Sequence, residues 1–212
     1  MKGKSAMFDR QTRKFCSAVV EALPEVPPEI MQGLITNPRA LQKALRDALL
    51  PPAYRIWKTI QGFCDSVEEC LDALPAAGCN NTRSAEYLFS RVNFAPNDSE
   101  VTLVRITPLD LGFTFKPTYR QFCECAAKSR LVMCEPNDGP DLRLNYLDQP
   151  EGENIFIAMN PVAAIDCFYR VFNLTHTRET GLTLTTSLCG LEMKIDPRGM
   201  WVFRSSMPQT GK

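Results

Sequence analysis

Six acidic residues gather between positions 135 and 153, where they form the densest set of side chains that could do chemistry. They are Glu135, Asp138, Asp141, Asp148, Glu151 and Glu153. Neighbouring carboxylates can bind a divalent cation or act as a general acid and a general base. A predicted strand of about 20 Å separates the first three residues from the last three, so the six cannot share one site. We therefore expect two solvated loop clusters here, and we assign no catalytic residue.

The single basic residue within this stretch suggests that it could instead bind a partner. On a predicted strand, Arg143 alternates with Leu142 and Leu144 and so faces away from their layer. A guanidinium on a sheet face can bind a carboxylate, a phosphate or a peptide, or it can form a structural ion pair with an acid of the helical layer. We predict that these residues contact a protein partner: Arg143, Tyr146, Asp148, Gln149 and Glu153.

The nine cysteines and the single histidine do not form a recognisable site. Cys123 and Cys125 are one residue apart, with Cys134 nearby, whereas zinc ligands are usually spaced more widely and number four. His176 is expected in a turn between strands, where nothing in the sequence orients it as the base of a Cys–His or Ser–His–Asp enzyme. We predict no metal and no cofactor, and we expect most cysteines to be small buried hydrophobic residues.

The charge balance argues against a broad attraction to nucleic acid or to anionic membranes. Lysine plus arginine and aspartate plus glutamate both number 24, so the formal net charge is +0. One basic run, Lys2 to Lys14, could bind phosphate groups or could be a solvated terminus.

We find no secretory signal and no apolar run long enough to span a membrane, so we expect a cytoplasmic protein. Phosphate-binding loops, dinucleotide fingerprints and nucleophile elbows are also missing.

Helical spacing dominates residues 1–98, which we predict to be a mainly helical region. Asn37-Pro38, Ser66 and Thr82 are good N-terminal caps for helices, and proline suits the first helical position. The aromatic-rich stretch at residues 53–63 is expected to pack in the core. The predicted helices cover residues 10–23, 38–50, 66–74 and 82–91.

Alternating patterns dominate residues 99–207, which we predict to be an α+β sheet region followed by a disordered tail at 208–212. The two regions could also form one continuous domain. Thr118 should cap a helix over 119–130. The predicted strands cover 100–106, 131–135, 167–174 and 182–188, and a last hairpin covers 191–204.

The segment at residues 139–161 is expected to organise this region as a β-hairpin. One apolar face carries Leu142, Leu144 and Tyr146, and a matching face starts at Ile155. The loop between them holds proline and glycine, which are turn residues. Register should be fixed by this alternation, because a slip of one residue would turn every apolar side chain towards water.

A longer motif runs through the same segment. It reads Gly139-Pro140-x-Leu142-Arg143-Leu144-x-Tyr146-x-Asp148-Gln149-Pro150-x-Gly152-Glu153, followed by Ile157-Ala158-Met159-x-Pro161. This motif resembles a family of small, uncharacterised soluble bacterial proteins in which such a segment follows a helix. The resemblance extends over roughly residues 35–205 and is weaker between about 163 and 198. It implies a shared fold, and because the family has no established activity it implies no catalytic residue.

Taken together, the patterns predict an α+β protein in which a helical N-terminal half packs with a mostly antiparallel C-terminal sheet. We predict a non-enzymatic cytoplasmic binding or accessory protein that recognises a protein or peptide partner. Two alternatives stay open: a hydrolase or transferase that uses the loop carboxylates, and nucleic-acid binding through the basic N-terminal arm. The sequence does not define an oligomeric state.

Overall fold

The structure, a computed structural model, describes residues 55–63, 66–94, 100–164 and 166–206, together with Ser17, Gln32, Thr36 and Asn37. The chain divides into two compact units, Met1–Leu50 and Pro51–Lys212. The helices predicted at 10–23 and 38–50, the basic arm at 2–14 and the tail at 208–212 lie outside the described residues.

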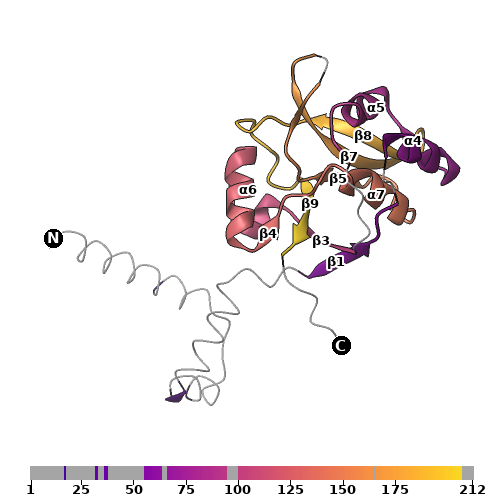
Figure 1. Cartoon of the computed structure of the whole chain (residues 1–212). Coiled ribbons are helices and arrows are strands. Elements are labelled where there is room, and N and C mark those ends of the chain that lie inside the picture. The colour runs from indigo at the N-terminus through magenta and orange to yellow at the C-terminus, as the bar shows by residue number, and fades with distance from the viewer. Residues whose placement is uncertain are drawn as a thin grey trace. The chain divides into compact units, whose positions relative to one another are not determined.

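A mixed sheet forms the centre of the second unit, and over the described residues it has nine strands (Figure 1). The strands of its main path follow the order β1-β3-β9-β5-β7-β8-β2, while β4 pairs with β9 and β6 with β7. The β5–β9 and β2–β8 pairs are parallel, and the other described pairs are antiparallel. The strands are β1 Ile56–Ile60, β2 Asn80–Asn81, β3 Val101–Ile106, β4 Leu131–Val132, β5 Asn154–Ile157, β6 Val162–Ala163, β7 Tyr169–Thr177, β8 Gly181–Leu188 and β9 Met200–Ser205.

Three helices begin at the residues that the sequence indicated. The side-chain oxygens of Ser66, Thr82 and Thr118 each accept a hydrogen bond from the backbone N–H three residues later, at 3.2–3.3 Å. Each cap satisfies a backbone donor that the first turn of a helix leaves unpaired. The helices are α4 Val67–Ala76, α5 Arg83–Phe89, α6 Tyr119–Lys128 and α7 Asp138–Asn145, with the 3₁₀ helix η1 at Pro108–Leu111.

Helices cover both faces of the sheet. Figure 1 shows α4, α5 and α7 together on one side of the strands and α6 on the other. On the α6 side, Phe122 packs against Trp201 and Phe203 of β9, with ring centroids 5.8 and 5.4 Å apart. On the other side, Phe172 of β7 packs against Phe89 of α5 at 5.2 Å. This arrangement confirms the predicted α+β class with a mostly antiparallel sheet.

The predicted hairpin over 139–161 is wrong in its first arm, which is the helix α7. Every residue from Asp138 to Arg143 is buried, so the helix has no solvent-facing side that sequence periodicity could reveal. The segment has no β-branched residue, and Pro140 lies in the first turn, where proline fits a helix. The second arm is confirmed as β5, in which Ile155 and Ile157 are buried.

The last predicted hairpin is also wrong, although its second arm is the strand β9. Residues 191–195 make only one bridge, from Lys194 to Thr118, because they run past the start of α6. The carbonyl of Met193 accepts a hydrogen bond from the backbone N–H of Tyr119 at 2.9 Å. β9 pairs instead with β3 and β5, which lie far away in the sequence.

Strands from both sides of the predicted division near residue 98 belong to one sheet. β1 precedes it and pairs with β3, and β2 precedes it and pairs with β8. Residues 55–94 therefore supply strands to the same sheet as residues 100–206. The strand predicted at 100–106 is β3, and four of its residues, from Val101 to Val104, are buried, so both of its faces are covered, as expected.

Candidate functional site

Strand β1 contains a β-bulge that turns two consecutive side chains towards one ring. Its pairing with β3 advances by two residues in β1, from Ile56 to Lys58, while β3 advances by one, so Trp57 is an extra residue. Neighbouring side chains of a regular strand point to opposite faces, and a bulge breaks this alternation. The Trp57 ring packs edge-on against the Tyr146 ring at 5.0 Å between centroids, and the Lys58 ammonium lies 4.8 Å from the Tyr146 centroid.

Hydrogen bonds join this aromatic pair to the loop that follows α7. The Glu153 carboxylate accepts a bond of 2.7 Å from the Arg105 guanidinium and one of 2.8 Å from the Tyr146 hydroxyl. The Cζ of Arg105 lies 5.0 Å from the Trp57 ring centroid, which is a cation–π contact. Burial, helped by the hydrogen bond to the Glu153 carboxylate, raises the pKa of Tyr146 to about 12.

A second, looser ion pair also lies next to the Tyr146 ring. The Lys58 ammonium is 3.7 Å from Asp148 Oδ1, and the Asp148 side chain is 82% exposed. Solvent-exposed pairs of this kind contribute little to stability. We name the whole group the β1 cluster; it consists of Trp57, Lys58, Arg105, Tyr146, Asp148 and Glu153.

Two buried side chains hold the loop of the β1 cluster from beneath. The Arg143 guanidinium donates hydrogen bonds to the backbone oxygen of Tyr146 and to the side-chain oxygen of Gln149. The amide nitrogen of Gln149 donates in turn to the backbone oxygens of Glu153, at 3.1 Å, and Leu174, at 3.3 Å. The loop is thereby tied to α7 at one end and to β7 at the other.

His176 completes this attachment. The sequence predicted it in a turn, but it lies half-buried within β7, so that prediction is wrong. Its Nδ1 is 2.6 Å from the backbone oxygen of Gln149. Its backbone N–H donates to the Glu153 carbonyl at 3.4 Å, and its own carbonyl accepts from Gly152 at 2.8 Å. These contacts give His176 a structural role in holding the loop.

Arg143 is a buried cation whose hydrogen-bond partners are neutral. Within the described residues no carboxylate lies within 4.0 Å of its guanidinium, so the predicted alternative of an ion pair with an acid of the helical layer is not observed. Burial lowers the pKa of Arg143, and the nearby thiol of Cys79 is the main group that opposes this effect. Burial raises the pKa of Cys79, while Arg143 lowers it.

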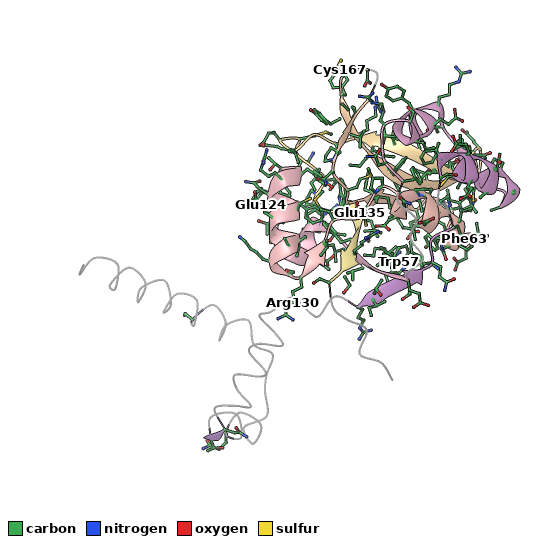
Figure 2. The ribbon with its side chains drawn as sticks, viewed as in Figure 1. Trp57, Phe63, Glu124, Arg130, Glu135 and Cys167 are labelled. Carbon is green, nitrogen blue, oxygen red and sulfur yellow. The ribbon has the colours of Figure 1, made fainter. Side chains whose placement is uncertain are left out.

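The structure brings the five predicted partner-binding residues into one segment, at two depths. Of the three that belong to the β1 cluster, Asp148 is exposed, Glu153 is half-buried and Tyr146 is buried, at 6%. Arg143 and Gln149 are buried more deeply, at 0% and 2%. The burial of Arg143, Tyr146 and Gln149 corrects the expectation that all five side chains lie on a partner-binding surface, and Arg143 is buried because the predicted hairpin arm is a helix. The sequence analysis missed Trp57, Lys58 and Arg105 as site residues; the aromatic-rich stretch at 53–63 contains the first two, and Arg105 lies in the predicted strand at 100–106. Figure 2 shows Trp57 and Phe63 close to β1 and well apart from Cys167.

The acidic residues have different partners, but the expectation of two solvated loop clusters is wrong for Asp138 and Asp141, which are buried in α7. The buried Asp138 forms a two-pronged ion pair with Arg204, at 2.6 and 2.8 Å. One carboxylate oxygen of Asp141 accepts the backbone N–H of Phe63 at 3.0 Å, and Glu151 lies 3.5 Å from Arg178. Asp138, Asp141 and Glu151 therefore each contact a different group.

The described cysteines are free thiols, and most of those placed by the fold are buried, as predicted. Burial raises the pKa of Cys123 to about 11 and of Cys189 to about 12, and it raises that of Cys134 as well. Such thiols are poor nucleophiles at neutral pH. Within the described residues, no three side chains of histidine, cysteine, aspartate or glutamate lie together as metal ligands would.

Among the described residues, no helix combines the length and the apolar character that a membrane span requires.

Comparison of the chain with protein-family models, with curated proteins and with solved structures found no match. The resemblance to a bacterial family therefore stays a prediction, and the β1 cluster is defined by its own geometry.

Proposed function

We propose that this chain is a non-catalytic binding protein that receives an extended segment of a partner protein along the free side of β1. One observation carries the proposal. Among the described residues, β1 is the last strand at its end of the sheet and pairs with β3 alone. A strand at a sheet edge offers backbone donors and acceptors to which an extended peptide can add as a further strand.

Exposed apolar side chains at the start of β1 and just after its end support this proposal. The side chains of Ile56 and Phe63 are 53% and 58% exposed, although the sequence predicted this stretch to lie in the core. Added strands gain affinity from backbone hydrogen bonds and specificity from the side-chain positions beside the edge. The bulge at Trp57 and the charge of Lys58 restrict pairing by arbitrary strands, since bulges and lysines are the usual means of protecting an edge.

The rigid support of the β1 cluster favours binding as well. The Arg143–Gln149 contact and the bonds to β7 hold Tyr146 and Glu153 in place before any partner arrives. Preorganisation of this kind reduces the entropy lost on association.

The free thiols suit a reducing compartment, which supports the cytoplasmic location that we include in the proposal.

The proposal is tested with a random peptide library displayed on phage and selected against the full chain. We expect the enriched peptides to protect the backbone amides of β1 from hydrogen exchange. Phe63→Ser should weaken their binding, because Phe63 lies three residues after the end of β1. Phe115→Ser should not, because Phe115 is equally exposed, at 59%, but lies between η1 and α6. Protection confined to other strands, or failure to enrich any peptide, would overturn the proposal.

A further inference from the structure

We infer that the segment bound along β1 carries acidic side chains, which Lys58 and Arg105 receive; this inference rests on the proposed function. The two cations come from neighbouring strands, β1 and β3, and each is positioned over an aromatic ring. Lys58 lies over Tyr146 at 4.8 Å, and Arg105 lies over Trp57 at 5.0 Å. Aromatic contacts of this kind already restrict the rotamers of long basic side chains, so these side chains lose less conformational entropy on binding.

Arg105 has more donors than the protein uses. A guanidinium carries five N–H groups in a planar fork that fits a carboxylate. Within the described residues its only hydrogen bond runs from NH1 to Glu153 Oε1, at 2.7 Å. The Arg105 side chain is 32% exposed, so the remaining donors can reach a ligand.

Lys58 uses even fewer of its hydrogen-bond donors than Arg105 does. Its ammonium carries three N–H donors, and the nearest carboxylate in the described part of the chain, that of Asp148, lies 3.7 Å away. That separation exceeds the range of a normal hydrogen bond. With 26% of its side chain exposed, Lys58 can bind an incoming carboxylate while its stem stays packed.

The acids of the β1 cluster do not offer a comparable surface to a basic segment. Both oxygens of Glu153 are occupied, one by Arg105 and the other by the Tyr146 hydroxyl. Asp148 is the one carboxylate that a basic segment could reach, and it stands beside Lys58, which would repel that segment. The unused hydrogen-bonding capacity of the cluster therefore consists of donors, and donors with positive charge select carboxylates.

The peptides selected from the phage library against the full chain provide the test. We expect aspartate and glutamate to be enriched among them, and we expect affinity to fall as salt concentration rises. Lys58→Gln and Arg105→Gln should each weaken the binding of an acidic peptide by about two- to fivefold, the range for a partly exposed charge pair. Lys58→Arg should retain binding. Arg120→Gln is the matched control, because Arg120 forms an exposed ion pair with Glu192 outside the β1 cluster.

A variant of Asp148 distinguishes an acidic ligand from a basic one. Asp148→Asn should tighten binding of an acidic peptide, since it removes a competing and repelling carboxylate. Tighter binding after Lys58→Gln, or enrichment of lysine and arginine among peptides that still protect β1, would overturn this inference and leave the proposed function intact. Loss of all β1-protecting peptides would overturn both.

Discussion

The buried side chains of Arg143 and Gln149 hydrogen-bond to each other, and this contact connects α7 to the loop that carries the β1 cluster. The Gln149 amide nitrogen also donates a hydrogen bond to the carbonyl of Leu174 in β7. A single amide group thus joins a helix, a loop and a strand. The geometry of the β1 cluster therefore depends on Arg143 and Gln149, whose side chains are buried.

Replacing Arg143 by methionine should lower the free energy of unfolding by about 2–4 kcal/mol, because two buried acceptors lose their donor. Urea unfolding measures the change. Arg178→Met is the control, since the exposed Arg178–Glu151 pair should contribute no more than about 0.5 kcal/mol. A gain in stability for Arg143→Met would show that the cost of burying the guanidinium exceeds the value of its hydrogen bonds.

Gly139→Ala should destabilise the protein by about 1–3 kcal/mol through overpacking. A Cβ at Gly139 would lie 3.0 Å from both Cβ and Cδ2 of Phe172, so α7 would have to move away from β7. Gly190→Ala provides a matched comparison, because a Cβ there meets nothing within 4 Å. Thermal unfolding of the two variants distinguishes them, and equal melting temperatures would contradict the close approach of α7.

Tyr146 should make stability fall at alkaline pH. Its pKa is raised from about 10 to about 12 in the folded state, so the neutral phenol is favoured by folding. This contribution is complete below pH 10 and is lost as pH rises towards 12. The stability difference between wild type and Tyr146→Phe should therefore shrink across that interval, as measured by urea unfolding at each pH. Tyr169→Phe, which alters an exposed ring, should leave the profile unchanged.

Cys167 should react first with iodoacetamide among the described cysteines. It is exposed, whereas Cys70, Cys79, Cys134 and Cys189 are buried. Reaction requires access and a thiolate, and burial removes both. Mass spectrometry of peptides from the labelled protein gives the rate at each position. Rapid labelling of Cys134 in the folded protein would contradict its burial against β9, where its thiol donates a hydrogen bond to the Val202 carbonyl.

Much of the secondary structure could be predicted because its signals are local. The caps Ser66, Thr82 and Thr118 each act within three residues of their own position, so sequence alone was sufficient to find them. The segment that forms α7 was predicted wrongly because its environment depends on residues far away in the sequence. Its charged residues are buried by contacts from elsewhere in the chain: Asp138 by Arg204 and Asp141 by the backbone of Phe63.

The candidate site was predictable only in part. Tyr146, Asp148 and Glu153 lie close together in the sequence, and their loop carried recognisable turn residues. Their partners on β1 and β3 are far away in the sequence, and the bulge that turns Trp57 and Lys58 together leaves no mark in a pattern of alternation. Spatial pairing of this kind depends on strand register, which a single sequence does not give.

The central position of β9 has a consequence for how the protein is made. Within the described residues, β9 alone connects the β1–β3 pair to the strands β5, β7, β8 and β2. During translation β9 leaves the ribosome after all of them, so the two groups of strands keep open edges until β9, which ends at Ser205, has emerged. Open edges and long-range pairing slow folding and promote association of unfinished chains. The growing polypeptide should therefore need a chaperone most during the interval just before β9 emerges.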